Sequence, residues 1–194
     1  MKIRYTTSAV ALFLCLPSSA CLKAQSPQAG SVQPAREPTP ATKMESFKPA
    51  AGSVMTLGYD ELGRIGQISV DVREMHNSAG DRVRGLVVDV RESQYRTERA
   101  FVDADEISEL IKGFDALLQI NSNPTSFKNF EVRYATRGQL ELTAFNGSRD
   151  GISYSVKAGR VTGASAFLKS DQMTQLRGLF VAASRKLESS NSGK

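Results

Sequence analysis

Apolar and polar positions alternate in the first half of the folded region and then change to a helical period. Alternation with a period of two is typical of strands that bury one face. It predicts strands over 67–73, 83–92 and 99–102, with an earlier strand over 53–59. The apolar residues from Ile107 to Leu118 instead fall on one stripe at helical spacing, which predicts a helix.

The same order of elements returns in the second half. Pro124 cannot continue the first helix. Alternating positions then predict strands over 130–134, 140–144, 152–156 and 164–168, and an apolar stripe predicts a closing helix over 173–187. The expected fold class is α+β, with two pseudo-repeats of three to four antiparallel strands followed by one helix.

A shift of 66 residues superimposes the strand-to-helix junctions of the two halves. The segment "AFVDADEISEL" (100–110) then faces "AFLKSDQMTQL" (166–176). Four positions are identical, namely Ala100/Ala166, Phe101/Phe167, Asp105/Asp171 and Leu110/Leu176. Self-similarity at a fixed spacing is the signature of a repeated unit, so we expect a two-repeat domain.

The first residues carry the three parts of a bacterial-type secretory signal. Lys2 and Arg4 precede a short apolar core, and small residues lead to a cleavage position near Ala20. Residues 1–20 are therefore predicted to direct export, to the periplasm or the outside of the cell. Cys21 follows at the position where bacterial lipoproteins receive their lipid, although Ser18 stands where such signals usually have Leu. A lipid anchor on Cys21 and a soluble, secreted product both stay open.

Residues 21–52 are rich in Pro, Gln, Ala and Ser and poor in large apolar residues. Such a segment buries too little surface to offset its ordering entropy, so it is predicted to be a disordered tether. Residues 53–194 are predicted to form a single domain. Only Cys21 remains after loss of the signal, and an internal disulfide is therefore excluded.

Charge adds little evidence for a nucleic-acid partner. The chain has a formal net charge of +5, but Lys2, Arg4 and Lys23 lie in the first 24 residues, which contain no acid, so removing that segment leaves +2. Solvent-facing strand positions alternate in sign, as in the run from Asp71 to Arg73, which favours cross-strand ion pairs over a phosphate track. The aromatic residues Phe130 and Tyr154 are expected to face inward.

The acidic run in "FVDADEISEL" (101–110) is the densest cluster of candidate chemistry. Asp103, Asp105, Glu106 and Glu109 could form an oxygen-rich metal site. The favoured interpretation is a helix start, in which Asp103 or Asp105 caps the helix and Glu106 lies in its first turn. Three of the four acids are absent from the second copy, as expected of a cap, and we predict no metal here.

Catalytic motifs are not evident. His76 is the only histidine, and it lies in a predicted turn over 76–81. No nucleophile elbow, phosphate loop or His/Cys metal spacing is present. We therefore expect a non-enzymatic protein without a cofactor, and a carboxylate-dependent hydrolase is kept as an alternative because separated acid pairs leave no motif.

The layout resembles two families. The two strand-then-helix repeats, and the segment "GISYSVKAGRVTGASAFLKSDQMTQL" (151–176), resemble the whirly and PUR-type domains, and this resemblance implies single-stranded nucleic-acid binding as an alternative function. The signal, tether and single domain resemble small uncharacterised exported proteins of bacteria. The leading expectation is an exported envelope protein that binds another envelope protein or polymer, with possible membrane attachment through Cys21 and with nucleic acid disfavoured as a partner.

Overall fold

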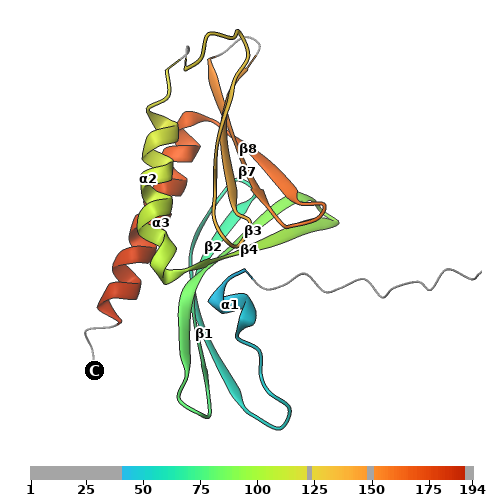
Figure 1. Cartoon of the computed structure of the whole chain (residues 1–194), viewed down its shortest axis with the longest axis vertical. Coiled ribbons are helices and arrows are strands. Elements are labelled where there is room, and N and C mark those ends of the chain that lie inside the picture. Colours follow the sequence, from blue (N-terminus) through green and yellow to red (C-terminus); the bar gives the residue numbers. More distant parts are fainter. Residues whose placement is uncertain (1–40, 122–123, 148–150, 191–194) are drawn as a thin grey trace, which may run out of the picture. The chain divides into compact units, whose positions relative to one another are not determined.

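Two four-stranded antiparallel sheets, each followed by a helix, make up the folded part of the chain (Figure 1). The computed structural model describes residues 41–121, 124–147 and 151–190, which all belong to one compact unit. The predicted signal over 1–20 and Cys21 lie outside the described residues. This architecture confirms the predicted α+β fold with two repeat-like units.

Each repeat runs through its sheet in sequence order and ends in a helix. Sheet A has the order β1-β2-β3-β4 and sheet B the order β5-β6-β7-β8. The first repeat contains β1 (Met55–Ile65), β2 (Ile68–Asn77), β3 (Arg82–Ser93), β4 (Arg96–Asp103), the short 3₁₀ helix η1 (Ala104–Glu106) and α2 (Ile107–Leu118). The second contains β5 (Glu131–Ala135), β6 (Glu141–Asn146), β7 (Ile152–Ala158), β8 (Ala164–Leu168) and α3 (Ser170–Ser189).

The 66-residue shift holds for the last strand and the helix of each repeat. It places β4 on β8 and the start of α2 inside α3. The preceding strand departs by two residues: Leu86 pairs with Val102, whereas Tyr154, 68 residues later, pairs with Leu168. An offset of two leaves every side chain on the same face of the sheet, so the burial pattern of the repeat is kept.

The β1–β2 hairpin is longer than the sequence predicts. Strand β1 extends to Ile65, which pairs with Ile68 across the two-residue turn at Gly66. Gly66 has φ of 58°, a left-handed conformation that suits such a turn. At the other end, β2 includes His76 and runs to Asn77, so the predicted turn over 76–81 starts too early.

One apolar core joins the inner faces of both sheets to α2 and α3. The alternating residues predicted to face inward are buried in sheet A, among them Ile68, Val70, Leu86 and Val88. The two helices pack side by side in Figure 1 and contribute their predicted stripes, including the fully buried Phe114 and Phe180. Burial of these stripes on one side of each element is what fixes the helices against the sheets.

The folded unit begins before the predicted boundary at residue 53. Residues 43–46 form the short helix α1 (Lys43–Ser46) on the outer face of sheet A, the face turned away from the main core. A reciprocal capping box starts it, because Thr42 Oγ1 accepts from the Glu45 amide at 3.0 Å and Glu45 Oε2 accepts from the Thr42 amide at 3.1 Å. The predicted disordered tether is therefore wrong for this end of the segment.

Helix α1 seals a small second core. Met44 is only 3% exposed and packs with Met75 and Val87, with Phe47 and Phe101 beside them. Gly85 of β3 makes this possible, because a Cβ there would overlap both the Met44 sulfur and the backbone of Val102. Close approach of a side chain to a sheet is one of the uses of a strand glycine.

A candidate ligand-binding groove

The acidic run binds α1 instead of capping α2. The Asp103 carboxylate is buried and accepts hydrogen bonds from the backbone amides of Lys43 at 2.8 Å and Met44 at 3.1 Å. Neither η1 nor α2 has a side-chain cap. The predicted capping by Asp103 or Asp105 is therefore wrong, because these acids serve a segment about 60 residues earlier in the chain.

Two further acids of the run hold α1 and the β5–β6 turn together. Asp105 pairs with Lys43 Nζ at 2.8 Å and also with the Arg137 guanidinium. Glu106 pairs with Arg137 Nε at 3.2 Å and accepts from its backbone amide at 2.8 Å. The hydrogen bond from Lys43, supported by Arg137, lowers the pKa of Asp105 although partial burial opposes the shift.

We call Asp103, Asp105, Glu106, Lys43 and Arg137 the acidic latch. Within the ranges that the structure describes, no group of three or more His, Cys, Asp or Glu side chains could hold a metal ion. Each acid of the latch already has a cationic or amide partner. The latch therefore works as a structural clamp on the start of the folded unit.

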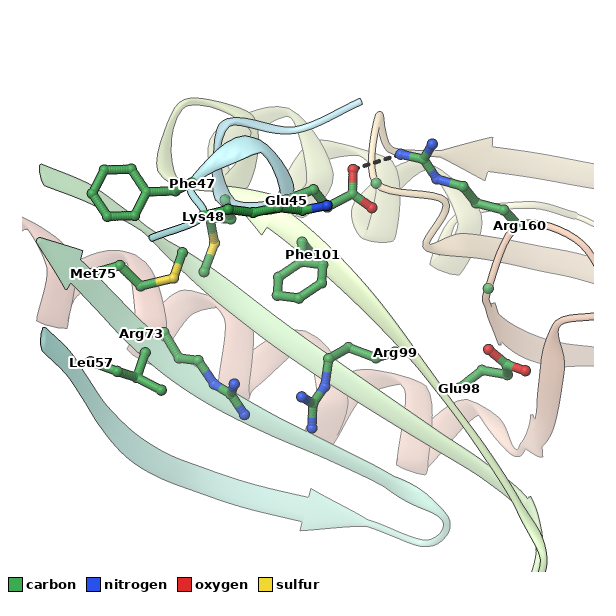
Figure 2. Close-up of a pocket in the computed structure, with 13 residues that line it drawn as sticks. Glu45, Phe47, Lys48, Leu57, Arg73, Met75, Glu98, Arg99, Phe101 and Arg160 are labelled. Carbon is green, nitrogen blue, oxygen red and sulfur yellow. Dashed lines mark hydrogen bonds and ion pairs between the residues drawn. The ribbon is translucent and has the colours of Figure 1, made fainter. Parts of the chain in front are cut away.

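Beside the latch, the outer face of sheet A carries a groove of about 510 Å³. This outer-face groove lies between α1, the strands of sheet A and the β7–β8 turn (Figure 2). Its apolar surface comes from three strands and from α1: Leu57 on β1, Met75 on β2, Phe101 on β4 and Phe47 at the end of α1. The volume is in the range of pockets that bind small molecules.

Two arginines meet on the floor of the groove. Arg73 comes from β2 and Arg99 from β4, and their guanidinium groups point toward one another (Figure 2). Arg73 Nη2 pairs with Asp71 at 3.1 Å, and Arg99 makes a two-pronged pair with Asp89 at 2.7 and 2.8 Å. The Asp89–Arg99 pair joins neighbouring strands, as predicted, whereas Asp71 and Arg73 pair within β2 and not across strands.

The partner carboxylates lie on the same face of sheet A as the two arginines, since Asp71 is two residues from Arg73 on β2 and Asp89 is directly opposite Arg99. Asp71 and Asp89 do not line the outer-face groove, and Asp89 lines a separate hollow of about 330 Å³ at the β1–β2 end of the sheet. The hydrogen bonds that Arg99 donates to Asp89 raise the pKa of Arg99. An arginine held from one side by an acid keeps its remaining N–H donors for a ligand, because a guanidinium has five.

The remaining wall of the groove is also polar. Glu45 of α1 pairs with Arg160 of the β7–β8 turn at 2.6 Å, as the dashed line in Figure 2 marks. Lys48 and Glu98 line the rim, and Lys48 makes no ion pair with any residue in the described part of the chain. The lining thus contains four basic and two acidic side chains, and Asp71 and Asp89 beside it pair with two of the basic ones. The donors left for a negatively charged ligand include Lys48 and the remaining N–H groups of Arg99.

The latch and the groove share one row of sheet A. Arg73, Gly85 and Asp103 lie directly opposite one another on β2, β3 and β4. Met44 fills the space over Gly85, between the arginine that lines the groove and the aspartate that binds α1. Release of α1 would therefore remove one wall of the groove.

Sequence reasoning found some of these residues and missed others. It placed Arg73 on a solvent-facing strand position, and it correctly expected Phe130 and Tyr154 to be buried. It missed α1, although Thr42 and Glu45 carry the S/T-x-x-E spacing of a capping box. His76 lies on β2 and does not line the groove.

No protein-family model and no curated protein matches the chain. Over the described ranges, no helix combines the length and the apolar character needed to cross a membrane.

Proposed function

We propose that this chain is an exported, non-enzymatic envelope protein that binds another envelope component in the outer-face groove. The observation that carries the proposal is the convergence of Arg73 and Arg99 beside an apolar surface made by Met75 and Phe101. Ligand pockets typically combine a mainly apolar lining with a few well-placed polar groups.

The composition of the lining supports binding as its role. The groove residues supply cations, apolar side chains and two carboxylates, one of which is paired with Arg160. Ser, Thr, Cys and His do not occur in the lining, so it lacks the hydroxyl, thiol and imidazole groups from which most nucleophile–base pairs are built. Such a set of side chains can bind a ligand and fix its orientation.

The amino-terminal pattern supports the location. The predicted signal over 1–20 directs export, and a lipid on Cys21 would attach the domain to a membrane. Helix α1 follows the proline-rich segment directly in the sequence and supplies Met44 and Glu45 to the groove, and the two residues after its end supply Phe47 and Lys48. The groove is therefore built in part from the end of the chain that leads to the anchor.

Hydrogen-exchange mass spectrometry on the full chain tests this proposal. Lipid, glycan and protein fractions of a bacterial envelope are added separately. We expect one fraction to protect the backbone of residues 44–48, 71–76 and 97–102, and to leave β6 (Glu141–Asn146) of sheet B unchanged. Protection of sheet B alone, or of no segment by any fraction, would overturn the assignment of the groove.

Matched variants separate the groove from the rest of the surface. Leu57→Glu places a carboxylate on the apolar part of the groove, at a side chain that is 42% exposed. Val54→Glu introduces the same charge three residues earlier at a 71% exposed side chain outside the lining. The protection should disappear in the first variant and persist in the second.

A further inference from the structure

We infer that the ligand of the outer-face groove is an anionic single-chain amphiphile, with an apolar tail and a carboxylate or phosphate head. This inference rests on the proposed function and specifies the chemical class of its ligand. It follows from the way in which apolar and cationic side chains are separated inside the groove.

The apolar end of the groove lies at α1. Phe47 and Met75 lie on the α1 side, and Phe101 lies between them and Arg99 (Figure 2). Met75 is 7% exposed, and it extends the small core formed by Met44 and Val87. An apolar tail placed here would continue a surface that already packs well, and its burial would supply roughly 25 cal/mol per Å².

The cationic end lies farther from α1. Arg99 has 45% of its side chain exposed, and only the Nε and Nη2 atoms are bonded to Asp89. Its Nη1 group can therefore donate to an oxyanion. Arg73 points at the same place from β2 and stacks at 6.0 Å over the Tyr59 ring, which holds it in position.

The separation distinguishes this ligand from a uniformly charged polymer. A nucleic acid or an acidic peptide carries repeated negative charge along its length, and it would bring charge against Phe47 and Met75. The volume of about 510 Å³ also suits one small molecule or one chain end. An anionic amphiphile can place its tail against the apolar end of the groove and its head group against the cationic end.

Isothermal titration calorimetry with three small probes tests the class. Dodecanoate below its micellar concentration supplies tail and anion, dodecyltrimethylammonium supplies the tail with the opposite charge, and butanoate supplies the anion with little tail. We expect dodecanoate to bind at a ratio of 1:1 and at least about tenfold more tightly than either of the others. The cationic probe lacks the charge-assisted hydrogen bonds, and butanoate lacks most of the apolar surface that the tail would bury.

A pair of arginine variants tests whether the head group of the ligand binds at Arg99. Arg99→Gln should weaken dodecanoate binding by about tenfold or more. Arg133→Gln removes an exposed arginine that pairs with Glu131 on sheet B, and it should leave the affinity unchanged. Unfolding curves of the two arginine variants check that both remain folded, since each loses one exposed ion pair.

Three results would overturn the inference. These are equal binding of the anionic and cationic probes, equal binding of dodecanoate and butanoate, or equal effects of Arg99→Gln and Arg133→Gln. Binding of a polyglutamate peptide or an oligonucleotide that depends on Arg99, with none of dodecanoate, would refute the amphiphile but leave the groove as a binding site. Absence of groove protection by every envelope fraction would instead refute the proposed function itself.

Discussion

Phe114 of α2 and Phe180 of α3 are separated by 66 residues, and their rings touch with centroids 5.1 Å apart. Sixty-six residues is also the shift that superimposes the strand-to-helix junctions, so the two rings are equivalent positions of the two repeats. Both side chains are fully buried. The contact therefore joins the repeats at matching points, and the two helices depend on each other.

Truncating either ring should be costly. Phe114→Ala and Phe180→Ala should each lower the free energy of unfolding by about 3–5 kcal/mol, because a large cavity is left in a closely packed core. The double variant should lose less than the sum of the two, since the ring contact is removed by the first change. Urea unfolding measures all three. Phe167→Ala, at a side chain 74% exposed on β8, is the control and should cost less than about 1 kcal/mol.

If the acidic latch holds α1 in place, removing the Asp103 carboxylate should loosen α1 more than the rest of the fold. Asp103→Ala removes the acceptor for the amides of Lys43 and Met44, which should lower the free energy of unfolding by about 1–3 kcal/mol. Amide exchange of these two residues should quicken more than that of the strands. Glu109→Ala, at an exposed acid paired with Lys112, should not change their exchange. Equal exchange rates in the two variants would show that Asp103 does not hold α1.

Acid should weaken the latch through Asp105. The pKa of Asp105 is lowered in the folded protein, chiefly by the hydrogen bond from Lys43. A carboxyl with a lowered pKa stabilises the fold above its ordinary pKa, and the contribution disappears as pH falls through the folded value. Wild type should therefore exceed Asp105→Asn by less than about 1 kcal/mol near neutral pH, since the side chain is 48% exposed.

The urea midpoints of wild type and Asp105→Asn should converge as the pH is lowered from 6 to about 2. Asp171→Asn is the matched control. It changes the equivalent acid of the second repeat, for which no ion pair occurs in the described part of the chain. Its midpoint should follow wild type throughout. A constant difference between Asp105→Asn and wild type at all pH values would contradict the electrostatic origin.

Alanine substitutions at two helical glycines should change the free energy of unfolding in opposite directions. Gly113 of α2 is buried, and a Cβ there would lie 2.7 Å from the Tyr134 ring, so Gly113→Ala should destabilise by about 1–3 kcal/mol. Gly178 of α3 is exposed with no atom within 4 Å of its would-be Cβ. Gly178→Ala should stabilise by about 0.5–1 kcal/mol, as alanine favours a helix. Thermal unfolding of both variants is the measurement, and the same sign for both would contradict this account.

The periodicity of the chain was sufficient to predict the sheets and the two long helices. Ile68, Val70 and Leu86 show why, since strict alternation over a strand leaves only one face to bury. That Arg73 and Arg99 line the same groove was not predictable in this way. It depends on the register of β2, β3 and β4, which brings together residues that are 26 positions apart.

Helix α1 escaped prediction for a different reason. It is four residues long and follows a proline-rich segment, so its local signal is weak apart from the capping box of Thr42 and Glu45. Its position is fixed by Asp103 and by the absence of a side chain at Gly85, both distant in sequence. Short helices depend on tertiary contacts more than on propensity.

Methionine-methyl NMR tests the central claim, that the outer-face groove is the ligand site. Met44 and Met75 line the groove, whereas Met173 is buried in the main core and Met55 begins β1. With dodecanoate added to the full chain, the methyl signals of Met44 and Met75 should shift and saturate together, and that of Met173 should stay in place. Shifts at Met173 without shifts at Met44 and Met75, or no saturable shift at either groove methionine, would contradict the account.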